Sequence, residues 1–177
     1  MAQYRVSRGR VAARARSSLH DTTTTWTKLA GELEVLPDEP MRAAQARIVV
    51  DMREFDAGDR LKNWKLRSDL EPDRHPEAVF TLSAIEEAQP LGGGAWRAVA
   101  RGTLAWRGRT TAVLARGEAQ FADDSVHARA TFSLDVTRLG VTPPKILFLK
   151  VENVVEVTVE LTAELDAMRT GPTPPAA

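Results

Sequence analysis

The side chains best suited to chemistry in this sequence are three histidines, because cysteine is absent. His20 precedes Asp21 and a run of four threonines, so a neutral imidazole there could donate a hydrogen bond to an oxygen of a ligand head group. The alternative is that His20 only stabilises a loop. Neighbours in an extended chain point to opposite faces, which argues against a catalytic pair of His20 and Asp21. A cofactorless enzyme that uses His20 is therefore the least favoured hypothesis.

The other two histidines indicate no chemical role: His127 is expected to be solvated, and His75 is expected to mark the start of a strand. His127 lies on the polar side of an alternating segment, and His75 precedes Pro76, which favours extended backbone at that histidine. No spacing typical of a metal site or of a nucleophile elbow occurs. The three glycines at 92–94 lack the flanking residues of a phosphate-binding loop, so they indicate a hairpin. We expect no catalytic residue, no metal, no cofactor and no enzyme activity.

The overall composition narrows the choice of partner. The 177 residues fit one domain, and 24 basic residues balance 24 acidic ones. Nucleic-acid binding depends on clustered positive charge, so no nucleic-acid partner is expected. No apolar run approaches the roughly 18–20 residues of a spanning helix, so we expect no integral membrane association. The start of the chain has no apolar leader core, which favours the cytoplasm, with the periplasm as the alternative if a leader has been removed.

A two-residue alternation of apolar and polar side chains recurs along the chain and predicts strands. It is clearest at 155–165, where Val155, Val157, Val159 and Leu161 alternate with glutamate and threonine. Eight strands are expected in this way, at 11–15, 29–35, 44–52, 78–84, 96–106, 111–121, 125–136 and 155–165, with a short leading piece at 4–6. Hairpins are expected at 92–94, 107–108 and 123–124.

Helices are few in this interpretation. One is predicted at 58–70, and a second short helical or irregular stretch at 143–150. Residues 1–165 should form the domain, and the tail at 166–177, rich in proline, should be disordered.

Eight amphipathic antiparallel strands favour an all-β fold, a sandwich or a closed barrel, and closure removes exposed edges. The inward parity is rich in small side chains: Ala13, Ala15, Ala44, Ala46, Ala98, Ala100, Ala115, Ala119, Ala128 and Ala130. Such a wall cannot fill an eight-stranded barrel, so helix residues such as Trp64 and Leu66, or an apolar ligand, should occupy the space. The alternative is a self-filled barrel, its centre taken by tryptophan and phenylalanine, that acts as an interaction module.

Several fragments, taken in order, resemble the YceI-like family of bacterial polyisoprenoid-binding proteins. They are Ser-Leu-His-Asp at 18–21, Leu-Arg-Ser-Asp-Leu at 66–70, His-Pro-Glu-Ala-Val-Phe at 75–80, Gly-Thr-Leu at 102–104 and Arg-Leu-Gly-Val at 138–141. The resemblance implies an eight-stranded antiparallel, lipocalin-like barrel with one or two short helices. It also implies that the barrel binds a polyisoprenoid or quinone chain, to sequester or transport it.

Parity identifies the apolar residues expected to contact such a ligand. They are Ile48, Val50, Phe80, Leu82, Trp96, Leu104, Trp106, Val113, Phe121, Phe132, Leu134, Val157, Val159 and Leu161, with His20 as a possible head-group contact. A one-residue bulge would invert the assignment within any strand. A homodimer is compatible with this interpretation.

Overall fold

The computed structural model describes residues 1–142 and 151–167. Its elements, in chain order, are β1 (Ala2–Ala15), β2 (Thr22–Trp26), β3 (Leu29–Val35), β4 (Ala44–Asp51), β5 (Phe55–Asp56), α1 (Arg60–Leu70), β6 (Glu77–Gly92), β7 (Ala95–Trp106), β8 (Arg109–Phe121), β9 (Ser125–Asp135), the 3-10 helix η1 (Val136–Leu139) and β10 (Val154–Leu165). Among the described residues, no helix has the length and apolar character needed to cross a membrane.

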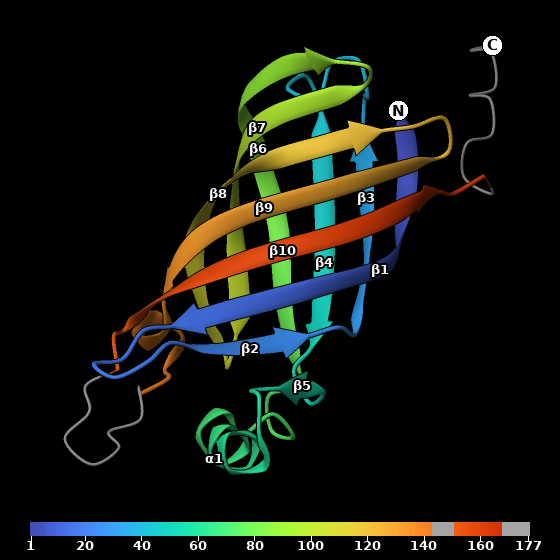
Figure 1. The fold of residues 1–177 in the computed structure, drawn as a ribbon. Helices are drawn as coiled ribbons and strands as arrows, with labels where there is room; N and C mark the ends of the chain where they lie inside the picture. The colour runs from blue at the N-terminus through green and yellow to red at the C-terminus, as the bar shows by residue number, and fades with distance from the viewer. Residues whose placement is uncertain (143–150, 168–177) are drawn as a thin grey trace.

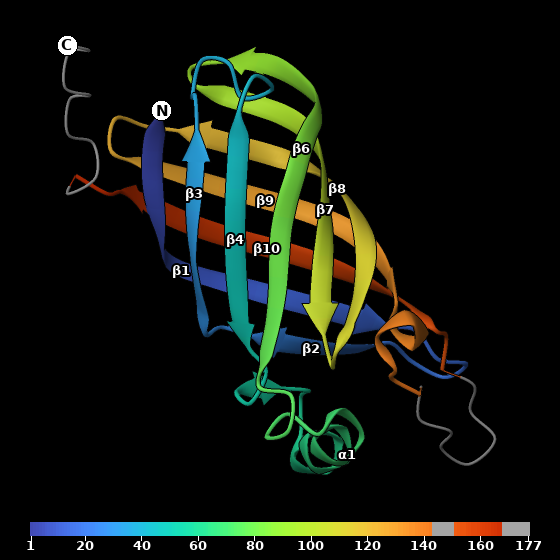
Figure 2. The ribbon, with the colours of Figure 1, turned by 180° about the vertical axis from the view of Figure 1, so that it is seen from behind.

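The strands close into a barrel. Antiparallel pairing runs β10-β9-β8-β7-β6-β4-β3-β1, and β10 also pairs with β1, so eight strands form a ring. Figure 1 and Figure 2 show β9, β10 and β1 crossing one wall at a tilt and β3, β4 and β6 forming the opposite wall. β2 pairs with the second half of β1, and β5 with β2. The predicted eight-stranded antiparallel barrel is confirmed.

β1 combines two pieces that the sequence analysis treated separately. Its register against β10 shifts between Val6 and Arg8. A bulge adds one residue, so the inward parity changes from even to odd numbers along this strand. Tyr4 is therefore buried and Val11 also faces the interior, although the two positions are seven apart and a regular strand would place them on opposite faces.

A second correction concerns β6, where the register shifts between Leu82 and Ala84. Strict alternation along the predicted strand at 78–84 would place Ala84 on the same face as Phe80 and Leu82, but Ala84 is exposed and Ile85 is half-buried. The alternation of apolar and polar residues does not reveal a bulge, because the residues on both sides of the bulge still fit a strand.

β2 was missed in the sequence analysis, which interpreted its four threonines as a polar run. Threonine is β-branched and suits an extended backbone. In the structure Thr24 and Trp26, two residues apart, are both buried on the inward side of β2. The strand thus adds a polar and an aromatic side chain to the interior.

The helix predicted at 58–70 is observed as α1, which lies across one end of the barrel (Figure 1). Asp59 caps its first turn, accepting a hydrogen bond from the Lys62 backbone N–H at 2.9 Å, and Glu71 ends it in the left-handed conformation. The predicted strand at 125–136 ends one residue earlier, where η1 begins. The stretch predicted as helical or irregular at 143–150 lies outside the described residues, as do residues 168–177 of the predicted tail.

The three expected hairpins are present. The β7–β8 turn has positive φ at both central residues, 56° at Arg107 and 70° at Gly108. This is the combination that a two-residue turn needs to match the twist of its strands.

Gly102 on β7 is required by close packing against β6. A Cβ at this position would lie 2.5 Å from Cε2 of Phe80 and 2.5 Å from the Thr81 carbonyl oxygen. The absent side chain therefore allows the Phe80 ring to lie close to the backbone of the neighbouring strand.

We expect Gly102→Ala to lower the free energy of unfolding by about 1–3 kcal/mol, because the new methyl group must displace the Phe80 ring or the β6 backbone. Urea denaturation measures this as a lower midpoint at unchanged slope. Thr110→Ala, at an exposed position of β8, is the control and should leave the midpoint almost unchanged. An unaltered midpoint for Gly102→Ala would contradict the packing described.

Candidate ligand cavity

One end of the barrel is filled by its own side chains. Tyr4, Val35, Val126, Leu161 and Ala163 form a buried cluster there, which we call the packed end. The ring of Phe121 lies 6.2 Å, between centroids, from that of Tyr4 and adds to it. The packed end therefore closes the barrel without any other molecule.

The rest of the interior is hollow. A cavity of about 360 Å³ extends from Leu161 to the inner side of α1. Its lining comprises Val11, Ala13, Ala15, Thr24, Trp26, Ile48, Val50, Met52, Leu66, Leu70, Ala78, Phe80, Ala100, Leu104, Trp106, Ala115, Ala128, Ala130, Phe132, Leu134, Val136, Leu139, Val141, Val151, Glu152, Val155, Val157, Val159 and Leu161. These side chains are apolar except for the Thr24 hydroxyl, the Glu152 carboxylate and the indole N–H groups of Trp26 and Trp106. A volume of this size falls within the range of about 300–1,000 Å³ typical of small-molecule sites.

Small side chains create this space. Six of the alanines predicted to face inward line the cavity: Ala13, Ala15, Ala100, Ala115, Ala128 and Ala130. Apolar space that its own side chains leave unfilled is unfavourable relative to a packed interior, so an apolar occupant would stabilise the barrel.

Most of the apolar residues predicted as ligand contacts border this cavity. They are Ile48, Val50, Phe80, Leu104, Trp106, Phe132, Leu134, Val157, Val159 and Leu161. Their contact with a ligand stays a prediction, but the structure brings these side chains around one space.

Four of the predicted residues do not border it. Phe121 packs against Tyr4 in the packed end, and Val113 is buried within β8. Leu82 borders a second, more open pocket formed by residues of β1, β3, β4 and β6, and Trp96 is half-buried near the β6–β7 turn. Parity assigns a residue to a face of the sheet, but it does not give the height of that residue along the barrel axis.

Helix α1 supplies part of the cavity wall. Leu66 and Leu70 line it, as the sequence analysis expected for Leu66. Trp64, the other residue expected to fill the barrel, is 70% exposed instead. Leu66 and Leu70 are four apart and share a helix face, whereas Trp64 lies off that face. Sequence reasoning could not choose between these faces, because both carry large apolar side chains.

Two arginines fasten α1 to the barrel. The Arg67 guanidinium donates to the Arg53 carbonyl at 3.2 Å and lies over the Phe55 ring at 5.0 Å. Arg107, in the β7–β8 turn, donates to the Leu70 carbonyl at 2.6 Å and lies 3.7 Å from a Glu71 carboxylate oxygen. Both contacts hold the carboxyl-terminal half of the helix, one from Arg67 in its last turn and one at the Leu70 carbonyl.

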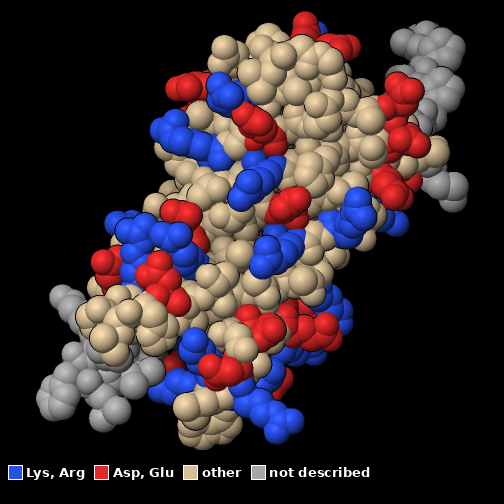
Figure 3. Space-filling model, viewed as in Figure 1, with Lys and Arg blue, Asp and Glu red and all other residues tan. Residues whose placement is uncertain are grey.

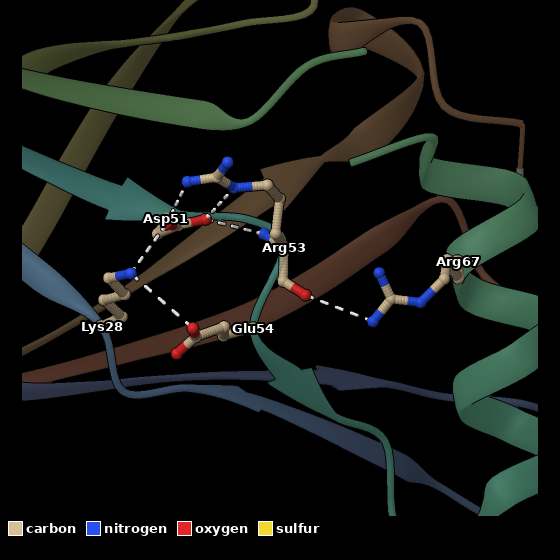
Figure 4. Close-up of polar contacts among 5 residues, drawn as sticks. All are labelled: Lys28, Asp51, Arg53, Glu54 and Arg67. Atoms are coloured by element: carbon tan, nitrogen blue, oxygen red, sulfur yellow. Dashed lines mark hydrogen bonds and ion pairs between the residues drawn. The ribbon is translucent and has the colours of Figure 1, made fainter. Parts of the chain in front are cut away.

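Arg53, whose carbonyl accepts the hydrogen bond from Arg67, belongs to a charged cluster at the end of β4 (Figure 4). Asp51 accepts two hydrogen bonds from the Arg53 guanidinium, at 3.0 and 2.9 Å, and lies 3.4 Å from the Lys28 ammonium. The hydrogen bond from Arg53 holds the pKa of Asp51 well below its ordinary value. The ionised carboxylate therefore fixes the segment that carries the Arg53 carbonyl.

None of the three histidines borders the cavity. His20 is exposed, and its backbone N–H donates to the Ser17 hydroxyl at 3.3 Å, which fits the loop-stabilising alternative. Asp21 lies 3.5 Å from Arg14. His127 is exposed on β9, with Nδ1 3.1 Å from the Thr162 hydroxyl.

The fold belongs to the class of closed, lipocalin-like antiparallel barrels, here built around an apolar cavity. A sequence model of the YceI-like domain matches residues 5–163, and the chain belongs to the YceI-like family. The resemblance found in the sequence is confirmed. No curated protein matches this chain in sequence.

Solved structures share the fold at low sequence identity. Burkholderia cenocepacia BcnA is 19% identical with a TM-score of 0.70, covering 87% of this chain and 95% of BcnA. A domain of Saccharophagus degradans, described as polyisoprenoid binding, is 12% identical with a TM-score of 0.73, covering 94% and 100% of the two chains. A mutant of the CJ YCEI protein is 10% identical with a TM-score of 0.61, covering 80% and 83%.

Asp51→Asn should make unfolding less sensitive to acid. Because the folded state lowers the pKa of Asp51, this carboxylate stabilises the protein above about pH 4, and the stabilisation is lost as the pH falls further. We expect the variant to have a lower free energy of unfolding at neutral pH, with the difference shrinking below about pH 4.

Denaturant unfolding across the acid range measures this difference. Glu54→Gln is the control, since Glu54 is exposed and has only a 3.6 Å contact with Lys28. A constant difference between the wild type and Asp51→Asn at all pH values would show that Asp51 does not act through its charge.

Proposed function

We propose that this protein binds a long apolar chain, such as a polyisoprenoid or a prenyl quinone, inside the barrel and sequesters or carries it. The observation that supports the proposal is the cavity of about 360 Å³ with a wall of short apolar side chains. The polyisoprenoid-binding description of the Saccharophagus degradans domain favours the same ligand class.

The physical basis of binding would be burial of hydrocarbon. Each methylene group removed from water contributes about 0.8 kcal/mol, before the costs of ordering the ligand. Affinity should therefore rise with chain length until the cavity is full. Few polar contacts are needed, which agrees with a lining that is apolar except at a few groups.

The rival hypothesis, an interaction module with a self-filled barrel, accounts for the packed end but not for the hollow part. The two tryptophans and two phenylalanines of the lining stand around the space without filling it: Trp26, Trp106, Phe80 and Phe132. On the face of the protein drawn in Figure 3, acidic and basic side chains are intermixed, so this face has no cluster of positive charge that would favour a nucleic-acid partner. Ligand binding remains the better account of the geometry.

Protein purified under mild conditions should retain lipid. Native mass spectrometry should find a bound mass that organic extraction releases, and the delipidated protein should take up farnesyl and longer prenyl chains with increasing affinity. Protein that is empty as purified and that also refuses prenyl chains would overturn the proposal.

Ala128→Leu should reduce the capacity of the cavity while keeping the fold. Ala128 lines the cavity on β9, so a larger side chain there occupies space that a ligand would use. We expect weaker prenyl binding, by about tenfold or more, together with a higher melting temperature of the empty protein.

The matched control is Ala112→Leu, which adds the same side chain at an exposed position of β8. It should change neither binding nor the melting temperature appreciably. Equal prenyl affinity for Ala128→Leu and the wild type would show that ligands bind elsewhere.

A further inference from the structure

Two neighbouring hydrogen-bond donors of β2 lie on the cavity wall. Trp26 is 7% exposed and its indole Nε1–H is buried without a hydrogen-bond partner among the described residues. Thr24 is also 7% exposed; no side-chain hydrogen bond of this residue is found within residues 1–142 and 151–167, and its hydroxyl is not among the fully buried atoms without a partner. Both line the cavity. They are two apart on β2, so they share one face and lie about 6.7 Å from each other along the strand.

The second tryptophan of the cavity shows the contrast. Trp106 also lines the space, but its Nε1–H donates to the His75 carbonyl at 2.9 Å. Buried donors in folded proteins are almost always paired, and leaving one unpaired is unfavourable. The Trp26 Nε1–H is therefore the exceptional donor among the described residues that line the cavity, and the Thr24 hydroxyl lies beside it on the same face of β2, where a ligand could supply an acceptor to both.

The charge around these donors limits what the acceptor can be. Among the described residues, no lysine, arginine or histidine lines the cavity, and Glu152, a carboxylate, is the one ionisable side chain of this part of the lining. A phosphate in this apolar surrounding would lose its hydration without gaining a counter-charge. A neutral oxygen acceptor, such as a carbonyl, meets no such penalty.

We propose that Trp26 and Thr24 form a head-group subsite that selects apolar-chain ligands carrying a neutral carbonyl oxygen, with Trp26 Nε1–H and the Thr24 hydroxyl as the donors. The inference rests on the proposed function. The chain of the ligand then extends past Phe80 and Val159 toward Leu161, where the packed end stops it.

The test compares three probes that share one prenyl chain: a farnesylated benzoquinone, farnesylbenzene and farnesyl phosphate. Equilibrium dialysis against delipidated wild-type protein should give the highest affinity for the quinone. Trp26→Phe and Thr24→Val remove the donors and keep most of the side-chain shape. Each should weaken quinone binding by about three- to tenfold and leave farnesylbenzene binding unchanged.

Thr111→Val is the matched control, because Thr111 is also 7% exposed but does not line the cavity. It should leave the preference for the quinone over the hydrocarbon intact. The subsite is refuted if farnesylbenzene binds as tightly as the quinone, if both probes weaken equally in Trp26→Phe and Thr24→Val, or if the phosphate binds best. Failure of all three probes to bind would instead refute the proposed function.

Discussion

The pairing of β10 with β1 is the constraint on which the interior depends, because it turns an open sheet into a ring. The outer face of this pairing is marked in the sequence by opposite charges in register: Arg5 faces Glu164, Arg10 faces Glu160 and Arg14 faces Glu156. Opposite charges across two strands favour one alignment over its neighbours. A shift by one residue would turn the apolar side chains of β10 toward water. The same alignment therefore defines both the closed ring and its apolar wall.

Once the ring is closed, its volume must be filled or enclosed, and this protein does both. Tyr4 and Phe121 fill one end, while alanines leave the middle hollow and α1 covers the other end. The arrangement gives the cavity a blind end and a covered end. Under the proposed function, the apolar chain of a ligand would point toward the packed end, and its polar terminus would lie near Thr24 and Trp26.

Much of the fold could be predicted from alternation alone, since each of the eight barrel strands carries it. The predictions failed where the backbone departs from a regular strand. The bulges in β1 and β6 change the inward parity, and strict alternation misplaces Ala84 for that reason. β2 was missed because threonine is compatible with both a strand and a loop. The alternation within one strand does not show how far along the barrel axis a residue lies. Phe121 was therefore predicted as a ligand contact, although it belongs to the packed end.

The left-handed backbone of Arg107 couples two distant parts of the molecule. At φ of 56° a side chain with a Cβ is disfavoured, and glycine or asparagine would suit the turn better. Arginine at this position gives up some local stability for a long-range contact with the last turn of α1. One side chain therefore links the β7–β8 turn to the carboxyl end of α1, so a substitution of Arg107 would change both the local backbone of the turn and one attachment of the helix.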